Sequence, residues 1–494
     1  MSTTNLPGQA SDRGQNRRLG IILATCCLSL FVVGIDVTIV NIALPSIQRS
    51  FHASVDGLQW TIDSYTVVIA SLLMLSGSLA DRFGRRRVFQ IGLALFTLGS
   101  LLCSLAPGLG WLVAFRMLQA VGGSMLNPVA LAIIANTFTE PARRARAMGV
   151  WASVVGISFA VGPVLGGVLV GTVGWRAIFW VNVPVGLAAI WLTQRFVPES
   201  RAPRPRRLDP VAQILIVVLL AGVTAATIEG PARGWTSPLI IGCYAAAAVA
   251  GIAVVLAESH RREPLIDPRF FASAPFAGAA LTAFAAFAAL AAFLFLNTIY
   301  LQSARGYSAI TAGLLILPMA ATNVASARLS GAMVAAGHPR WALLIAGVAI
   351  TAGAGVLMTV SAATPIAELI VVYTVFGLGF GFVNPPISNT AVSGMPAAQS
   401  GVAASIASTC RQVGATLGVA VAGSLVAGHE GAGFVAASHG GWAVVCGCGL
   451  AVIGVGYAST SGWARRTAER TRELLITEPE GGVTVHDRDA AAAT

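Results

Sequence analysis

The chain has 494 residues, of which 56% are hydrophobic and only 10% charged, and its mean hydropathy is +0.77. A soluble domain carries about 25% charged residues, so this composition excludes a water-exposed globular protein and indicates an integral membrane protein. All 31 basic residues are arginine. The absence of lysine from the sequence excludes a P-loop, whose Lys binds phosphates, and a pyridoxal-phosphate enzyme, whose Lys forms the Schiff base. We therefore expect no enzyme activity, no ATPase domain in this chain and no cofactor.

Apolar stretches of membrane-spanning length recur along the whole chain. A transmembrane helix needs about 20 mostly apolar residues. An even number of such helices returns the C-terminus to the side of the N-terminus. Fourteen stretches are predicted to span: 20–44, 58–79, 88–106, 110–135, 146–170, 176–194, 208–229, 237–257, 274–297, 310–331, 341–361, 366–387, 400–427 and 441–462.

The arginines test this topology. The net charge of +11 would favour nucleic acid as a partner in a soluble protein, but here the arginines lie in the short connections between spans. Twenty-four fall on the side of the termini, and only Arg49, Arg176, Arg233 and Arg305 fall on the other. Since positive charge accumulates in cytoplasmic loops, we expect both termini in the cytoplasm, a location in a bacterial cytoplasmic membrane and no nucleic-acid partner.

An internal repeat divides the chain into two halves. Arg116 precedes Asn127-Pro128 by eleven residues, and Tyr373 precedes Asn384-Pro385 by the same distance, at an offset of 257. Two related bundles around a central site are typical of secondary transporters. We expect an all-α polytopic protein of two six-helix bundles with two inserted central helices. The expected parts are a cytoplasmic N-tail (1–18), an N-terminal bundle (19–195), a linker with two inserted helices (196–273), a C-terminal bundle (274–462) and a disordered cytoplasmic C-tail (463–494).

Five ionisable residues are singled out inside predicted spans, where each charge is costly: Asp36, Asp63, Arg116, Arg328 and Arg411. Arg328 lies close to the cytoplasmic end of its span, where a long side chain reaches the interface. Asp36 fits two interpretations, a proton-binding carboxylate or a structural ion pair with Arg116, and the two are compatible. Asp63 lies near the start of its span, so it is either a second proton-coupling acid or an acid wetted at the interface. Arg411 is either part of a structural pair or part of the transport pathway.

The connection GSLADRFGRRR is the most specific string in the chain. Its glycine Gly77 would allow close helix approach, and Asp81 would accept hydrogen bonds at a helix N-terminus. Arg85 and Arg86 would then bond the other bundle, which gives a conformational latch on the cytoplasmic side. The alternative is a solvated basic loop that only sets topology. The latch candidates are Gly77, Asp81, Arg82, Gly84, Arg85 and Arg86.

Small residues line the fifth span in the string GISFAVGPVLGG. Glycines at such spacing let helices touch closely, and a proline bends the helix, although ordinary tight packing gives the same pattern. The residues concerned are Gly156, Gly162, Pro163, Gly166 and Gly167. Neither CxxC nor HExxH occurs in the sequence, so we expect no metal site.

These strings together resemble the major facilitator superfamily, in particular its 14-span drug:proton antiporter branch, the EmrB/QacA type. The resemblance covers residues 19–462 and includes the loop motif and the fifth-span motif described above. The first-span and fourth-span matches are Asp36, Thr38, Asn41, Ala43, Pro45, Arg116, Gln119 and Gly122. Two departures are Ser158, where the fifth-span motif usually has glycine, and Asn323, where some exporters of dications carry an acid.

The resemblance implies a proton-coupled exporter of amphipathic drugs, antibiotics or toxic metabolites, with the proton gradient as its energy source. Asp36, Asp63 and Arg116 would couple protons to export. Candidate substrate or structural residues are Asn41, Gln119, Asn323 and Arg411. We expect a monomer in the lipid bilayer. The alternatives are a dedicated metabolite transporter of the same superfamily and a membrane receptor or channel without transport.

Overall fold

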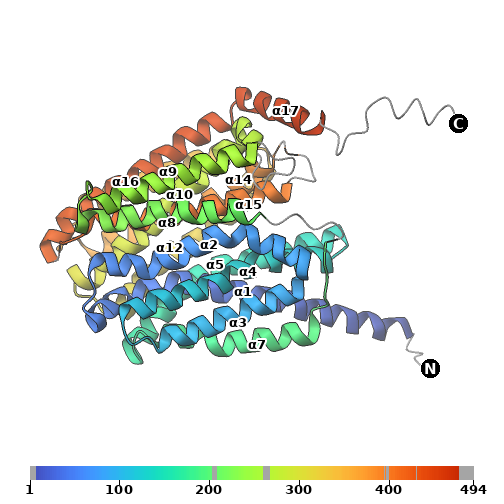
Figure 1. Cartoon of the computed structure of the whole chain (residues 1–494), viewed down its shortest axis with the longest axis horizontal. Coiled ribbons are helices and arrows are strands. Elements are labelled where there is room, and N and C mark those ends of the chain that lie inside the picture. Colours follow the sequence, from blue (N-terminus) through green and yellow to red (C-terminus); the bar gives the residue numbers. More distant parts are fainter. Residues whose placement is uncertain are drawn as a thin grey trace.

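The structure is a computed structural model that describes residues 7–202, 209–259, 268–393, 395, 400–429 and 431–477. All regular elements in these ranges are helices, and the long ones run side by side along one direction (Figure 1). The predicted all-α architecture is confirmed. The parts of the predicted linker at 203–208 and 260–267, and the tail from 478 to 494, lie outside the described residues.

The N-terminal half consists of seven helices that follow the apolar stretches closely. Breaks fall where the sequence disfavours a continuous helix. Gly84, for example, separates two helices with a φ of +111°, a conformation that glycine adopts without strain. The helices are α1 (Pro7–Phe51), α2 (Val55–Phe83), α3 (Arg85–Ser104), α4 (Leu109–Thr137), α5 (Pro141–Thr172), α6 (Ala177–Trp180) and α7 (Asn182–Phe196).

Two inserted helices precede the C-terminal half. They are α8 (Pro210–Arg233) and α9 (Pro238–Ser259), which pack against each other. The second half consists of the 3-10 helix η1 (Pro268–Ala272), α10 (Ala274–Ile299), the π-helix η2 (Tyr300–Ala304), α11 (Ala309–Leu315), α12 (Leu317–Ala335), α13 (Pro339–Leu357), α14 (Ile366–Val392), α15 (Ser400–Val426), α16 (Gly431–Ser459) and α17 (Gly462–Thr477).

The two halves pack their helices in the same pattern. In the first, α1 contacts α4, α5 and α7, and α4 also contacts α2 and α3; in the second, α10 contacts α14, α15 and α16, and α14 contacts α12 and α13. The contacts between halves obey the same correspondence, because α2 packs on α15 and α5 packs on α12. An approximate twofold relation therefore links the halves, as the repeat in the sequence indicates.

The predicted membrane spans all fall on helices. Among the described residues, thirteen helices are long and apolar enough to cross a membrane. The predicted span 400–427 forms α15, which is not one of the thirteen, because Arg411 and Gln412 reduce its apolar character. It nevertheless packs against α10 and α2 alongside the others. The polar pair thus lies within a helix of the bundle.

The predicted disordered tail, 463–494, is wrong over its first part, because Gly462–Thr477 forms α17. Ala464, Ala468 and Thr471 recur at helical spacing and are buried, and α17 packs on α10 and η1. The side chain of Thr467 accepts a hydrogen bond from the backbone N–H of Ala274 at 3.0 Å. The buried face of α17 is therefore sufficient to pack this helix against the bundle, although its other face is charged.

The two halves are joined at one end of the bundle. We call the end that carries the start of α1 and α17 the terminal face, and the other end the opposite face (Figure 1). Near the opposite face the Gln59 side chain donates to the carbonyls of Val419, at 3.2 Å, and Ala420, at 2.8 Å. Gln302 donates to the carbonyl of Ile42 at 2.8 Å. Among the described residues, these are the side-chain hydrogen bonds between the halves.

The inserted helix α8 is attached to the N-terminal half. Gln213 donates to the carbonyl of Ser71 at 2.5 Å, towards one end of α8, and the indole of Trp60 donates to Glu229 at 2.9 Å, towards the other. Helix α8 also packs on α15 of the second half. Its two bonds to α2 place the inserted pair with the first bundle.

Packing between the halves gives a stability prediction. A methyl group on Gly167 of α5 would lie 2.6 Å from the carbonyl oxygen of Ala309 and 2.9 Å from Cα of Ile310. Because these are backbone atoms, we expect Gly167→Ala to lower the free energy of unfolding by about 1–3 kcal/mol. Thermal unfolding in detergent, followed by tryptophan fluorescence, measures the effect.

The matched control lies on the same helix. A methyl group on Gly149 would have no atom within 4 Å, so Gly149→Ala should leave the unfolding midpoint unchanged or raise it slightly. Equal midpoints for the two variants would contradict the close packing of α5 against α11.

Candidate functional site

Two buried charges of the N-terminal half form an ion pair. Asp36 of α1 and Arg116 of α4 are 0% and 1% exposed, and Nη1 of Arg116 lies 2.5 Å from Oδ2 of Asp36. The structure therefore contains the ion pair that is one of the two interpretations of Asp36. Because bulk water does not reach this pair, each charge must be compensated by the groups in direct contact with it.

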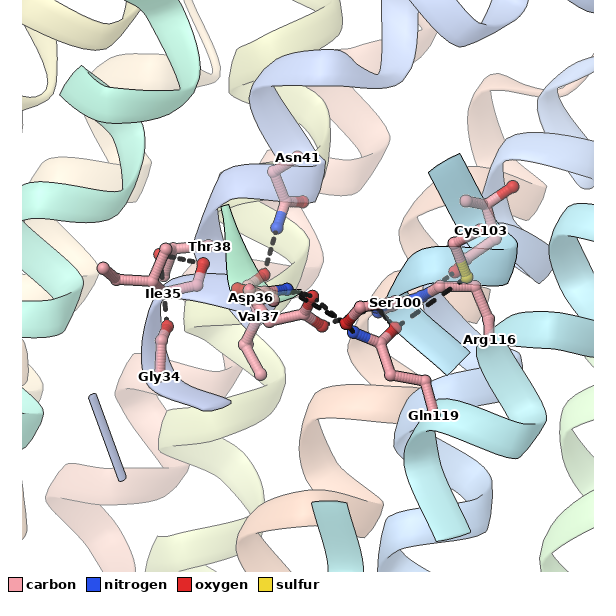
Figure 2. A network of polar contacts seen from close by, with 12 residues as sticks. Gly34, Ile35, Asp36, Val37, Thr38, Asn41, Ser100, Cys103, Arg116 and Gln119 are labelled. Carbon is pink, nitrogen blue, oxygen red and sulfur yellow. Dashed lines mark hydrogen bonds and ion pairs between the residues drawn. The ribbon is translucent and has the colours of Figure 1, made fainter. Parts of the chain in front are cut away.

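The second carboxylate oxygen of Asp36 is also bonded. Its Oδ1 accepts from Nε2 of Gln119 at 2.8 Å and from Nδ2 of Asn182 at 3.0 Å. Both amides donate in addition to the hydroxyl oxygen of Ser100, at 2.6 Å and 3.3 Å. Figure 2 shows Gln119 and Ser100 gathered beside Asp36. The carboxylate thus receives three donors from α4 and α7, and α3 supplies the hydroxyl that supports two of them.

Arg116 makes further contacts that fix its guanidinium. Nε donates to the carbonyl of Thr61 at 3.2 Å, and Nη1 donates to Oε1 of Gln119 at 2.7 Å. The guanidinium carbon lies 4.0 Å from the ring centroid of Tyr65, a distance at which a cation interacts with the π face. Helix α2 therefore joins the network through Thr61 and Tyr65.

Two other first-span matches lie beside this network. Asn41 donates to the carbonyl of Val37 on its own helix at 3.0 Å, and Thr38 donates to the carbonyl of Ile35 at 3.0 Å (Figure 2). Among the described residues, neither side chain bonds to Asp36. These residues shape α1, whereas Gln119 touches the ion pair directly.

Asp63 lies apart from the ion pair. It is fully buried on α2, where its Oδ1 accepts a 3.4 Å bond from Thr66 and its Oδ2 has no hydrogen-bond partner. Gln59, one turn earlier on α2, faces α15 of the other half. The helical spacing puts Asp63 on this same face, at the boundary between the halves. The structure brings Arg116 to Asp36 and does not bring Asp63 to either.

The glycines of α5 touch both halves. A methyl group on Gly162 would collide with Thr38, and one on Gly166 would lie 2.8 Å from Ile39, both on α1. Gly167 lies against Ala309 of α11, as described above. The same side of α5 continues to Gly156, whose added methyl would lie 3.1 Å from Val324 of α12, and Pro163 packs on Gly313 of α11.

The latch residues make contacts different from those expected. Asp81 pairs with Arg85 of the next helix at 3.0 Å, and Nη2 of Arg86 donates to the carbonyl of Gln194 at 3.0 Å. Arg82 packs over the neighbouring ring of Phe83. In the part of the chain that the structure describes, these side chains bond within the first half, so the expected bonds to the other bundle are absent there.

Gly77 also departs from its expected role, because an added methyl would meet no atom within 4 Å. The close approach occurs instead at Gly84, where a methyl would lie 2.6 Å from the carboxylate of Glu199. Gly77 thus faces open space, about two turns before α2 ends at Phe83. The chain after α7 returns to the α2–α3 connection at Gly84.

The role of Glu199 was not predicted from the sequence. Its Oε1 accepts from the backbone N–H of Arg86 at 3.1 Å, in the first turn of α3, and its Oε2 lies 3.8 Å from Nε of Arg87. The backbone of this segment adds a bond from the N–H of Arg85 to the carbonyl of Ser200 at 2.9 Å. A carboxylate at a helix N-terminus satisfies an unpaired donor and interacts well with the helix dipole.

Three residues of the network were also not predicted from the sequence: Asn182, Ser100 and Tyr65. An amide inside the apolar stretch 176–194 is a weak signal that could have pointed to Asn182. Hydroxyls are common in membrane helices, so no local signal singles out Ser100.

The second half holds the remaining candidates. Nη2 of Arg411 donates to the hydroxyl of Ser388 on α14 at 2.9 Å, and its guanidinium lies over the ring of Phe287. Asn323 is half-buried on α12, with its carbonyl close to Gly381 of α14. Within the described ranges, no group of three His, Cys, Asp or Glu residues could hold a metal ion.

The contacts of Glu199 give a prediction for this region. Glu199→Ala leaves the Arg86 N–H without its acceptor, so we expect the free energy of unfolding to fall by about 0.5–2 kcal/mol. Glu140→Ala is the matched control, because it removes an exposed pair with Arg143 worth about 0–1 kcal/mol. Thermal unfolding of the purified variants compares them. A larger effect of the control would contradict the capping role of Glu199.

Comparisons with known proteins agree with this architecture. The sequence model of the Major Facilitator Superfamily matches residues 26–419. The "Multidrug resistance protein Stp" of Mycobacterium tuberculosis is 38% identical over 413 residues, which cover 83% of this chain and 76% of that protein. The "Methylenomycin A resistance protein" of Streptomyces coelicolor is 33% identical, over 82% of this chain and 85% of that protein.

A third relative and a solved structure complete the comparison. The "Tetracenomycin C resistance and export protein" of Streptomyces glaucescens is 34% identical over 83% of this chain and 76% of that protein. The crystal structure of a D-xylose–proton symporter superimposes with a TM-score of 0.63 at 15% identity, covering 88% of this chain and 96% of that one, which shows a shared fold. The chain therefore belongs to the major facilitator superfamily and is a multi-pass membrane protein, not an enzyme.

Proposed function

We propose that this chain exports amphipathic drugs, antibiotics or toxic metabolites in exchange for protons, by alternating access. The observation that carries the proposal is the buried ion pair of Asp36 and Arg116, together with the amides of Gln119 and Asn182. A carboxylate that is enclosed by donors and shielded from bulk water can exchange one proton only when the protein opens a path to it.

The substrate class follows the relatives. Three of them are named for multidrug resistance, methylenomycin A resistance, and tetracenomycin C resistance and export. Each covers more than four fifths of this chain, including both halves. The buried core that joins the halves includes Ile39 and Ile42 of α1 and Phe293 of α10, and such aliphatic and aromatic groups suit compounds with a large apolar surface.

The orientation follows the charges of the connections. In the sequence, 24 arginines fall in the segments on the side of the termini and four in the connections on the other side, so the terminal face is cytoplasmic and the protein resides in the cytoplasmic membrane of a bacterium. Each half completes the pseudo-symmetric arrangement of one polypeptide, so a monomer suffices for transport. The energy source is the proton gradient, without a cofactor.

The proton acts on Asp36. Binding of one proton cancels the charge of this carboxylate, and Arg116 is then left with neutral acceptors, Oε1 of Gln119 and the carbonyl of Thr61. The guanidinium loses its counter-charge in a medium of low dielectric constant, so the arrangement of α1 against α4 becomes less favourable. Proton binding therefore favours the state of the transporter in which these helices are rearranged.

Alternation requires one side to open as the other closes. Gln59 and Gln302 hold the halves together near the opposite face, which is the outer side in the proposed orientation. These bonds support our inference that, in the proposed orientation, the protein is in an outward-closed state. Substrate binding and protonation of Asp36 favour different states, and exchange of one for the other follows from this linkage.

Everted membrane vesicles with an acidified lumen test the proposal. Adding a lipophilic drug should dissipate part of the pH gradient, because substrate enters the lumen as protons leave. Asp36→Asn keeps the shape of the side chain but removes the ionisable group, so we expect it to abolish this response. A pH-sensitive dye reports the gradient.

The control replaces an acid outside the network. Asp56 lies in the first turn of α2, and Asp56→Asn should respond as the wild type does. If the Asp36→Asn variant releases protons normally when substrate is added, the proposed proton role of Asp36 is wrong. A wild type that moves drugs equally well with and without an uncoupler would sink antiport itself.

A further inference from the structure

Arg411 is a cation inside the second bundle without a counter-charge. It lies near the middle of α15, and no acidic side chain of the described residues lies within 4 Å of its guanidinium. Its one side-chain hydrogen bond goes to the neutral hydroxyl of Ser388, and its Nε is buried without a partner. An intramembrane charge in this condition is costly and calls for an anionic partner.

Arg116, in the same protein, is a buried guanidinium whose charge is neutralised by its neighbours. Arg116 has a carboxylate at 2.5 Å, an amide oxygen at 2.7 Å and a backbone carbonyl at 3.2 Å. Arg411 has none of these three kinds of acceptor. Its one side-chain hydrogen bond goes to the Ser388 hydroxyl at 2.9 Å. The difference leaves Arg411 with donors available to a ligand.

The sequence of the second bundle offers no acid to neutralise Arg411. Between residues 268 and 459 the sequence has only two acids, Glu368 and Glu430. Glu368 lies in the first turn of α14, at the opposite face, and Glu430 lies outside the described residues. Among the residues that the structure describes, the interior of this bundle therefore carries positive charge alone.

The surroundings of Arg411 combine polar and aromatic groups, and they are accessible. Ser388 is exposed and Arg411 is half-buried, so the donor group reaches the surface of the protein. The ring of Phe287 lies 5.8 Å from the guanidinium and packs edge-on against Phe380 at 5.2 Å. Helix α15, which carries Arg411, also packs against α2 of the first bundle, so it is one of the helices at the boundary between the halves, where an alternating-access transporter binds its substrate.

We propose that Arg411 supplies the counter-charge for the substrate, and that the preferred compounds are aromatic acids, with a carboxylate or phenolate, rather than cations. This inference rests on the proposed export function and specifies its substrate class. The guanidinium binds the acidic group through charge-assisted hydrogen bonds, and the rings of Phe287 and Phe380 pack on the aromatic body. A cationic compound is repelled by the same charge.

One rival partner for Arg411 is Asp63, the acid on α2 at the same boundary whose Oδ2 has no hydrogen bond. The two do not pair in this structure. If they paired in the other state of the transporter, Arg411 would serve conformational coupling, and its loss would affect every substrate equally. Substrate selectivity therefore separates the two roles.

The experiment compares two fluorescent aromatic probes, the anion fluorescein and the cation ethidium, in everted vesicles that contain equal amounts of each variant. We expect the wild type to accumulate fluorescein in preference to ethidium. Arg411→Gln should slow fluorescein transport by about tenfold, as expected for loss of a charged hydrogen bond, and should not slow ethidium. Arg411→Lys retains the charge without the planar fork and should retain part of the fluorescein transport.

Arg328→Gln is the matched control, since Arg328 is an exposed arginine on α12 of the same bundle, and it should leave both probes unchanged. Size-exclusion chromatography and thermal unfolding establish that each variant is folded. If Arg411→Gln does not fold, Ser388→Ala and Phe287→Leu replace it, and each should slow fluorescein selectively.

The outcomes are distinct. Preference of the wild type for ethidium, or equal slowing of both probes by Arg411→Gln, overturns the inference while the export function stands. Equal slowing by Asp63→Asn as well would assign Arg411 to coupling. Transport of neither probe, and of no other drug, by the wild type contradicts the export function itself.

Discussion

The buried ion pair between Asp36 and Arg116 is the constraint on which the first bundle depends. Two charges taken out of water are tolerated only if their attraction and additional hydrogen bonds offset the loss of hydration. Here that requirement gathers four more groups, Thr61, Gln119, Asn182 and Ser100, from α2, α4, α7 and α3. Addition or loss of one proton at Asp36 therefore affects the packing of five helices, α1, α2, α3, α4 and α7, because the hydrogen bonds of these groups depend on one another.

The second bundle repeats this arrangement without charge. Tyr373 stands at the position of α14 that corresponds to Arg116, and its hydroxyl donates a short hydrogen bond to Oδ1 of Asn297 on α10. Helices α10 and α14 correspond to α1 and α4, so an uncharged pair occupies the place of the ion pair. Neither partner of the uncharged pair changes charge near neutral pH. The two bundles are alike in packing and different in chemistry, which assigns proton exchange to the first and leaves the charge of Arg411 in the second for a ligand.

Much of this organisation could be predicted from residues close together in sequence. Apolar stretches and the placement of arginine identified the spans, and the repeat identified the two bundles. The ion pair of Asp36 with Arg116 was one of the two interpretations of Asp36, because charged residues inside spans are few and each is costly. The roles of Glu199 and Asn182 could not be predicted, because their partners lie 113 and 146 residues away and depend on how α7 packs. The helix after Gly462 was missed because a polar composition hid its narrow apolar stripe.

Helix α5 explains how a local charge change can reach the boundary between bundles. Gly162 and Gly166 of α5 lie against Thr38 and Ile39 of α1, within one turn of Asp36. Gly167 lies against Ala309 of α11 in the second bundle. Because contact at these glycines involves backbone and short side chains, it has little room to adjust by rotamer changes. A displacement of α1 is then transmitted to α11 by rigid contact through α5. The glycines therefore act less as a source of flexibility than as a means of bringing two bundles close enough to move together.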